Sequence, residues 1–532
     1  MGLERRAWLA AAAAACVVSS GRAASAQERY TVFRVGADLG VSRISNEMFW
    51  QLNATGLLRL GPFRTDFYVP LRFRMDDFSF READYASARD ALRVVQCTRL
   101  DLGDYDRAED RHDPTCDRYR WRGGLHERTY LSARLSPIRE LSFGHSTLVS
   151  DFNNSLDPNT PQLGAQLDGL LRDIGEVRGF VDDVISPRVM GANVLLRPLQ
   201  AVGQNWDETP DDLVLRAGIV GDLAAPLRVR GAFGQTLRDG DGNVQQTTTG
   251  LTALTADAHY LYLWYGCTSQ GYGACEASRD IGLFGFVDYN RFLEVPDADG
   301  GHAGLRFRYR VRERYRRADG QALDGEGRMF DTWEVDAGAE GRWMGNRYLP
   351  GYFDGNYSVQ SQQFALNSDA RAFLGSDALS TSKLEYILSR PTGRTWGWQA
   401  FVRFMIPIPT ARGEAPSRLP ITLWAEDADG PLRTSVSATV GPVRLDQVIV
   451  GAQFLRRNFD GFGNLFSLDG ALIRVIGAVY LSSSETRRNS DSFLNNLVVN
   501  FAYTRRFLQE NSGALNATND FLVTLGSSLG IN

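Results

Sequence analysis

Five arginine residues occupy every second position in one short stretch of the chain. They are Arg306, Arg308, Arg310, Arg312 and Arg314. Alternate residues of a β-strand point to the same side, so these guanidinium groups would line one strand face over about 26 Å. The residues between them, such as Leu305 and Phe307, are apolar and would form the opposite face. A row of positive charges of this length can pair with carboxylates or attract anions from solution.

Acidic residues recur in the next alternating segment, residues 331–343. They are Glu334, Asp336 and Glu340. Opposite charges on neighbouring strands pair across a sheet. Two interpretations therefore stay open: the acids neutralise the arginines and stiffen a wall, or part of the row stays unpaired and lines an anion path. Four further arginines lie on the polar faces of other alternating segments and would add to the same polar surface: Arg34, Arg72, Arg74 and Arg403.

The histidines are scattered along the chain, with none of the spacings that metal sites use. They are His112, His126, His145, His259 and His302. We therefore predict no metal site and no cofactor, and no dinucleotide-binding, P-loop or haem-attachment motif is present. His259 lies two residues after Asp257, and such a pair could serve a hydrolase built into a barrel wall. That enzyme is the weaker alternative, and we predict no catalytic residue.

One acidic turn resembles the start of a calcium-binding loop. Residues Asp239–Asn243 read Asp-Gly-Asp-Gly-Asn. An EF-hand loop would need glycine at position 244 and glutamate at position 250. The chain has Val244 and Gly250 there, so a hairpin turn is the favoured interpretation and calcium binding stays an open alternative.

The first residues have the pattern of a secretory signal peptide. A positively charged start at Arg5 and Arg6 precedes an apolar stretch, residues 7–18, and then a small-residue cleavage site, Ala24-Ser25-Ala26. We predict a signal peptide over residues 1–26 and one mature domain over residues 27–532. A buried N-terminal helix is the alternative interpretation of the same stretch.

Four cysteines lie beyond this leader, in two local couples. Cys97 and Cys116 form the first couple, and Cys267 and Cys275 form the second. Three pairings are possible, and the clustering favours the local one, with each bridge closing a polar loop. Disulfides persist in the oxidising compartments that exported proteins reach. A zinc site would need pairs of cysteines with two residues between them, a spacing that is missing here.

Composition excludes several classes of protein. The chain has 532 residues, 43% hydrophobic and 23% charged, with a formal net charge of −5. Without a basic block, nucleic acid is not an expected partner. No run of eighteen apolar residues exists, so the sequence argues against a helical membrane protein.

Alternation of apolar and polar residues with a period of two recurs along the mature chain. Segments 63–76, 396–408 and 493–504 each have one oily, aromatic face and one polar face. Alternating segments of about ten residues are typical of strands that cross a bilayer, and only a closed barrel satisfies their backbone groups there. We predict an all-β fold, a transmembrane antiparallel up-and-down β-barrel with 18–24 strands and about 22 as the best estimate. Segment 80–122 is polar, and we expect it to constrict the lumen.

One stretch resembles a strand and loop of large porin-like barrels of the bacterial outer membrane. It runs from Leu141 to Val149 and continues from Asp151 to Pro158. The resemblance implies a place in the outer membrane, contact with lipid, and insertion by the barrel-insertion machinery. Such barrels usually end in an aromatic residue, whereas this chain ends in Asn532.

The resemblance and the polar lumen together predict passive, porin-like diffusion of small hydrophilic solutes, with anions as the candidate preference. This mechanism needs no enzyme activity. A non-conducting structural or surface-interaction barrel is the first alternative, the barrel hydrolase is the second, and a periplasmic β-rich protein is the third. The sequence leaves the transported solute and the oligomeric state open.

Overall fold

The computed structural model describes most of the mature chain. The described residues are 31–44, 47–60, 63–82, 85, 94–103, 129–138, 141–145, 147–150, 152–154, 162–171, 174–201, 212–228, 247–271, 274–313, 330–354, 357, 361, 365–366, 380–408, 417–427, 435–445, 447–456, 471–481, 497–509 and 515–531. The predicted signal peptide, residues 1–26, lies outside them.

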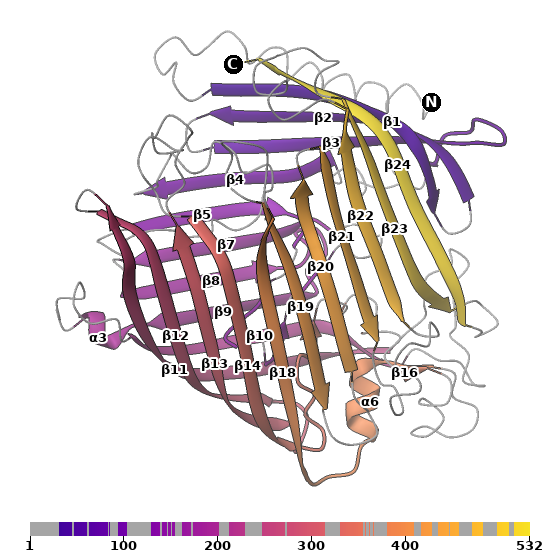
Figure 1. The fold of residues 1–532 in the computed structure, drawn as a ribbon. Coiled ribbons are helices and arrows are strands. Elements are labelled where there is room, and N and C mark those ends of the chain that lie inside the picture. Colours follow the sequence, from indigo (N-terminus) through magenta and orange to yellow (C-terminus); the bar gives the residue numbers. More distant parts are fainter. Residues whose placement is uncertain are drawn as a thin grey trace.

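Twenty strands of the described chain form one antiparallel sheet that closes on itself (Figure 1). The first strand, β1 (Thr31–Ile44), pairs with β2 (Glu47–Leu60) and also with the last strand, β24 (Leu515–Ile531). Every wall strand therefore has a hydrogen-bonded neighbour on both sides, which is the condition for placing strands in a bilayer. The predicted closed antiparallel barrel is confirmed, and its strand number lies within the expected range and slightly below the best estimate.

The wall runs in chain order between β2 and β24. Its first half consists of β3 (Phe63–Arg74), β4 (Val95–Gly103), β5 (Thr129–Ser136), β7 (Gly164–Leu171), β8 (Gly175–Val181), β9 (Val189–Leu196), β10 (Asp212–Arg228), β11 (Thr247–Gly271) and β12 (Ala274–Phe292). Its second half consists of β13 (Asp299–Glu313), β14 (Phe330–Gly345), β18 (Arg394–Ile408), β19 (Ser417–Asp427), β20 (Ser435–Leu445), β21 (Val448–Arg456), β22 (Leu472–Tyr480) and β23 (Val498–Gln509).

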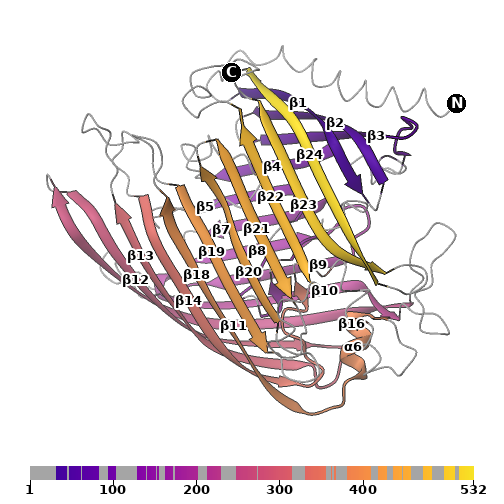
Figure 2. The ribbon, with the colours of Figure 1, turned by 45° about the vertical axis from the view of Figure 1, so that its right-hand side comes forward.

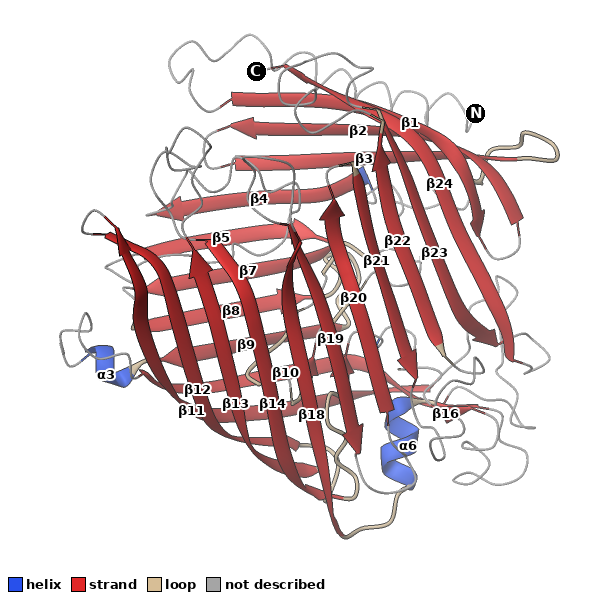
Figure 3. Cartoon of the chain, in the orientation of Figure 1, coloured by secondary structure: helices blue, strands red, loops and turns tan. Residues whose placement is uncertain are grey.

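The outer face of the wall is apolar. Leu283, Leu305 and Trp398 have exposed fractions of 47%, 63% and 45%, on three different strands. Successive side chains of a strand point to opposite faces, so the residues next to these point into the barrel. Figure 3 shows that nearly all the described secondary structure is strand. Among the described residues, no helix is long and apolar enough to cross a bilayer.

Described residues of two connections pack against the inner face of the wall. We call these connections, residues 137–154 and 346–391, the inner segments. The first carries β6 (Val149–Ser150), which pairs in parallel with β15 (Phe353–Asp354) of the second. The second also carries the β16 (Ala365–Leu366) and β17 (Ser380–Thr381) pair and helix α6 (Lys383–Ser389). Figure 2 shows α6 at the end of the barrel away from the C-terminal end of β24.

The inner segments form the hydrophobic core together with the inward face of the wall. Val220, Phe292 and Met344 come from wall strands and are almost fully buried, in one cluster with Phe152 and Tyr352 of the inner segments. The first turn of α6 is capped by the Ser382 hydroxyl, which accepts a hydrogen bond from the Glu385 backbone N–H at 2.9 Å. The apolar residues of the inner segments are therefore covered by the barrel and do not reach lipid.

The expected constriction over residues 80–122 corresponds to wall in one part. β4 (Val95–Gly103) lies within that range and pairs with β3 and β5. Residues 104–122 lie outside the described residues. A constriction of the lumen by the other residues of this segment stays a prediction. Among the described residues, it is the inner segments that pack inside the barrel.

Candidate functional site

The arginine row lies on the inner face of β13, because Leu305 and Phe307 between its members are exposed on the outside. The register of β13 and β14 places Arg308 opposite Asp336 and Arg310 opposite Glu334. Arg312 is part of β13, but its side chain is not described, and Arg314 lies outside the described residues. Three of the five predicted arginines can therefore be located on the inner face of the wall, and their role in lining a pore stays a prediction.

Two carboxylates of β14 form ion pairs with these three guanidinium groups. Arg306 donates from Nε to Asp336 Oδ1 at 2.6 Å, and Arg308 donates from Nη2 to the other oxygen, Oδ2, at 3.1 Å. Glu334 lies 3.6 Å from Arg308 Nε and 3.9 Å from Arg310 Nε. The cross-strand pairing that the sequence suggests is present, but each carboxylate is shared between two arginines.

A fourth arginine joins this group from β18. Arg403 is the register partner of Asp336 on the side away from β13. Its Nη2 lies 3.7 Å from Met405 Sδ, and no carboxylate pairs with it within the described part of the chain. We call Arg306, Arg308, Arg310 and Arg403, with Asp336 and Glu334, the arginine wall. On the other side of β13, Asp280 of β12 is the register partner of Arg310. The sequence signal of Arg403 was the period-two pattern of segment 396–408.

Glu340 belongs to a different cluster. Its carboxylate pairs with Arg342 at 2.6 Å and lies 3.5 Å from His302 Nδ1. Arg342 is almost fully buried and also pairs with Glu426 of β19 at 2.9 Å. Among the predicted acids, Glu340 therefore does not neutralise the arginine row, because its place on β14 is opposite Gly304 and not opposite an arginine.

Arg72 and Arg74 lie on β3, far around the ring of strands from β13. Arg72 donates to Gln51 Oε1 at 3.2 Å, and Arg74 donates to Glu47 Oε1 at 3.3 Å. Both contacts come from β2, the strand next to β3. These two arginines are therefore held by neighbouring strands and do not join the arginine wall.

The structure describes only part of the two predicted cysteine pairs. Cys97 is almost fully buried on β4 and is disulfide-bonded. Cys116 lies outside the described residues, as do residues 239–243 of the candidate calcium loop. Cys267 and Cys275 lie on β11 and β12, but their side chains are not described. The local pairing in both couples stays a prediction.

Polar contacts attach the inner segments to the wall. Tyr357 donates from its hydroxyl to Asp222 Oδ2 at 2.6 Å, and Thr147 donates to Asp288 Oδ2 at 2.7 Å. The chain's single lysine, Lys383, pairs with Asp354 at 3.2 Å within the inner segments. These groups are buried, where a polar group without a partner is costly, so the contacts favour one position of the inner segments.

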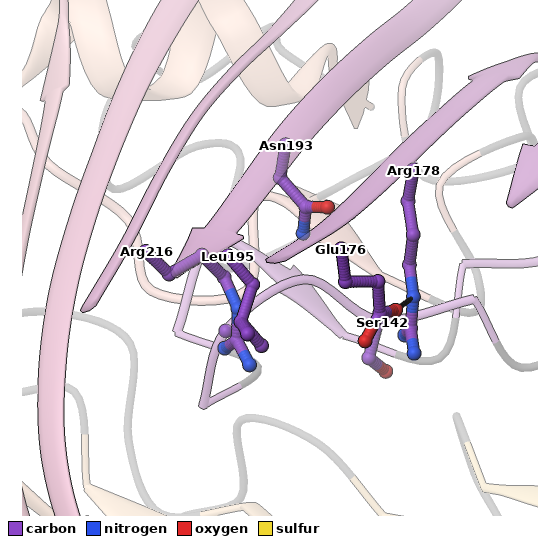
Figure 4. Close-up of a pocket in the computed structure, with 7 residues that line it drawn as sticks. Ser142, Glu176, Arg178, Asn193, Leu195 and Arg216 are labelled. Carbon is purple, nitrogen blue, oxygen red and sulfur yellow. Dashed lines mark ion pairs between the residues drawn. The ribbon is translucent and has the colours of Figure 1, made fainter. Parts of the chain in front are cut away.

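A small cavity lies where the first inner segment approaches β8, β9 and β10 (Figure 4). Its volume is about 120 Å³. The lining residues are Ser142, Gly144, Glu176, Arg178, Asn193, Leu195 and Arg216. Glu176 and Arg178 form an ion pair across its rim, and Arg178 also lies 3.6 Å from Asp168. The cavity is polar and charged, which suits water and small hydrophilic solutes.

The structure adds one histidine to the Asp257–His259 pair that the sequence had kept apart from it. His145 of the first inner segment lies beside Asp257 and His259 of β11. Burial lowers the pKa of His145 to about 4, so its ring is neutral near pH 7. Nothing in the spacing of 145 and 259 could have indicated this contact, because it depends on the inward folding of the segment.

The candidate hydrolase dyad does not have hydrolase geometry. His259 Nδ1 lies 3.9 Å from Asp257 Oδ1, which is longer than a hydrogen bond. Within the described residues, no hydroxyl or thiol is hydrogen-bonded to the His259 ring. A nucleophile and a base within hydrogen-bonding reach are the signature of such chemistry, so these residues do not support it.

Comparisons with known proteins show no family and only weakly similar solved structures. No family model and no curated protein matches the chain. The outer-membrane protein OpdK of Pseudomonas aeruginosa is 10% identical over 95% of this chain and 99% of its own, with a TM-score of 0.29. OccK3 (OpdO) of the same organism is 12% identical over 95% and 97%, with a TM-score of 0.32. A variant of the ferric enterobactin receptor PfeA is 9% identical over 94% and 80%, with a TM-score of 0.31.

The architecture is established by the strand pairing and the apolar outer face, independently of these weak similarities. The chain is a large closed β-barrel. A closed barrel with a lipid-compatible exterior and a polar interior is the design of outer-membrane barrels, and it fits the bacterial outer membrane.

Proposed function

We propose that this barrel is a channel for the passive diffusion of small hydrophilic solutes and that the arginine wall favours anions. A polar lumen lowers the cost of moving a hydrated solute across the membrane, and fixed charges on the wall bias which ions enter. The observations that carry the anion preference are that Arg306 and Arg308 share one carboxylate, Asp336, and that Arg403 beside them has no carboxylate partner among the described residues.

The exposure of Arg306 supports this role. Its side chain is 39% exposed although it pairs with Asp336, so part of the guanidinium faces the lumen. The group also lies 5.3 Å from the centre of the Phe401 ring and 5.8 Å from that of Phe284. Aromatic rings beside a cation hold its side chain against the wall without neutralising its charge. A solute anion could therefore approach a fixed positive group.

Planar-bilayer recordings with the full-length mature protein test the channel. Single-channel conductance steps are expected after addition of refolded protein. In a KCl gradient, the reversal potential should have the sign of the chloride equilibrium potential. The absence of steps from folded, membrane-inserted protein would refute the channel. Steps without chloride preference would leave the channel standing and refute the role of the arginine wall.

Substitutions separate the arginine wall from the protein's general charge. Arg403→Ala should lower the ratio of chloride to potassium permeability, because it removes a guanidinium that has no carboxylate partner among the described residues. Arg394→Ala is the matched control, since Arg394 stacks at 4.4 Å on the outward-facing Trp343 and lies outside the lumen. Equal permeability ratios in the two variants would contradict the proposal.

A non-conducting structural barrel is the second candidate. The observation that favours it is the core formed by the inner segments, which fills part of the interior next to strands β8 to β14. In this case the folded protein would enter bilayers without conductance steps. Lipid contact follows from the apolar outer face in both cases, and insertion by the barrel-insertion machinery is part of the proposal.

A further inference from the structure

Three side chains that could bind a metal converge on one point inside the barrel. Asp257 and His259 are two residues apart on β11 and share its inner face. His145 reaches them from the first inner segment through a turn at Gly144, which has a φ of +60°. A side chain at Gly144 would place its Cβ only 2.8 Å from Asp257 Oδ2, so glycine permits this close approach. We call the three residues the His–Asp cluster.

The donor atoms of the cluster face one another. Asp257 Oδ1 lies 3.6 Å from His145 Nε2 and 3.9 Å from His259 Nδ1, and one ligand atom from each residue lies within 4.8 Å of the other two. Both of these ring nitrogens are buried and have no hydrogen-bond partner among the described residues. Buried polar atoms normally have a partner, so two unsatisfied nitrogens facing one carboxylate oxygen indicate a missing ligand.

The spacing is near that of a tetrahedral transition-metal site. Zn²⁺ holds nitrogen and oxygen ligands at about 2.0–2.1 Å, which puts neighbouring ligand atoms about 3.4 Å apart. The observed separations of 3.6 and 3.9 Å would close to this value with shifts of a few tenths of an ångström. Two imidazoles and one carboxylate, with a fourth position left for water, form a ligand set that suits Zn²⁺ and similar divalent metals.

The surroundings orient these ligands. The His145 ring stacks on Phe286 with 4.0 Å between ring centres, which fixes the direction of its nitrogens. Arg216 donates from Nη1 to both carboxylate oxygens of Asp257, at 3.3 Å to Oδ2 and 3.5 Å to Oδ1, and so holds the carboxylate in place. Such outer contacts commonly hold metal-binding carboxylates in place. The positive charge of Arg216 opposes a cation, but Asp288 is the register partner of Asp257 on β12 and adds a carboxylate nearby.

We propose that the His–Asp cluster binds one divalent transition-metal ion and thereby ties the first inner segment to β11. Two ligands come from the wall and one comes from a connection folded into the lumen. A bound metal would therefore act as a crosslink between parts of the chain more than a hundred residues apart. This site does not depend on the proposed channel function, because it needs only the inner segment in its observed position.

Zinc titration of the full-length mature protein tests the site. After chelation and dialysis, calorimetric titration with ZnCl₂ should reveal one strong equivalent. His145→Gln and His259→Gln should each weaken it at least tenfold, because each removes one of three ligands. His302→Gln is the matched control: this buried histidine contacts the Tyr348 hydroxyl at 3.1 Å and should leave zinc affinity unchanged. No binding by the parent protein, or equal binding by all variants, would overturn the proposal.

Hydrogen exchange tests the crosslink itself. Zinc should slow backbone exchange in residues 141–154 of the parent protein, and His145→Gln should abolish this protection. His145 lies in a connection, so its loss leaves the strand pairing of the wall in place, and heat-modifiable gel mobility checks that the variant barrel is closed. Zinc-independent exchange in the parent protein would refute the crosslink even if zinc binds.

Discussion

The hydrogen bond from Tyr357 to Asp222 should control how often the inner segments leave the wall. Tyr357 lies in the second inner segment, and its hydroxyl donates to the fully buried carboxylate of Asp222 on β10 at 2.6 Å. The same carboxylate accepts from Arg188 at 3.0 Å and from the Ala224 backbone at 2.8 Å. Tyr357→Phe removes one donor and keeps the ring in the core.

The size of the effect follows from the type of bond. A hydrogen bond to a charged group contributes about 1.5–3 kcal/mol, and 1.4 kcal/mol corresponds to a factor of about ten in an equilibrium constant. If the bond breaks when the inner segments open, the substitution should raise the open population about 10-fold to 150-fold. Arg188 keeps Asp222 partly satisfied, so the lower part of this range is expected.

The chemical reactivity of Lys383 measures the open population. Lys383 is the chain's single lysine, and in the closed state it is 1% exposed and paired with Asp354. An amine-reactive ester can therefore modify it only after local opening, at a rate proportional to the open population. Mass spectrometry of the peptide that contains Lys383 measures this rate separately from that of the N-terminal amine.

A matched control and a refuting result complete the experiment. Tyr262 is on the outer side of β11 and is 46% exposed, so Tyr262→Phe should change the modification rate of Lys383 by less than about twofold. If Tyr357→Phe also leaves the rate within that margin, the bond to Asp222 does not hold the inner segments, and the reasoning from its geometry is wrong.

Two further predictions concern the wall and one of its turns. Leu305→Arg places a charge on the lipid side of β13 and should lower the free energy of unfolding in lipid vesicles by about 2–4 kcal/mol, as measured by urea titration, whereas Leu305→Phe should have little effect. Asp182 lies in the turn after β8, and burial raises its pKa to about 6. The folded state therefore holds this proton more tightly than the unfolded chain, and stability should fall as the pH rises from 4 to 6. Asp182→Asn should remove about 2 kcal/mol of this pH dependence, and equal pH profiles for the two proteins would contradict the assignment.

Periodicity along the chain was enough to predict the barrel. The alternation of apolar and polar residues is local, and it already determines which side of each strand can face lipid. Leu305 and Phe307 are outside and Arg306 and Arg308 are inside for this reason alone. The strand number was less certain, because short strands such as β8 and long ones such as β11 differ more than an average length per strand allows.

The partners of the charged residues needed the register of the sheet. Asp336 and Glu334 were predicted beside the arginine row and are found there. Glu340 was grouped with them but pairs with Arg342, because it is opposite Gly304. Arg403 was predicted on a polar strand face but not beside Asp336, because its strand is separated in the chain from β14 by the whole second inner segment. Alternation tells which face a residue occupies, but only strand pairing tells which residue lies beside it.

The inner segments and the His–Asp cluster depended entirely on tertiary structure. His145 and His259 are 114 positions apart, and the residues between them contain four wall strands and part of a fifth. Their contact arises because the apolar residues of the first inner segment are buried inside the barrel, and this burial brings the polar residues of the same segment to the wall. Local sequence determined that this chain forms a wall with two unlike faces, while long-range burial decided which residues meet inside it.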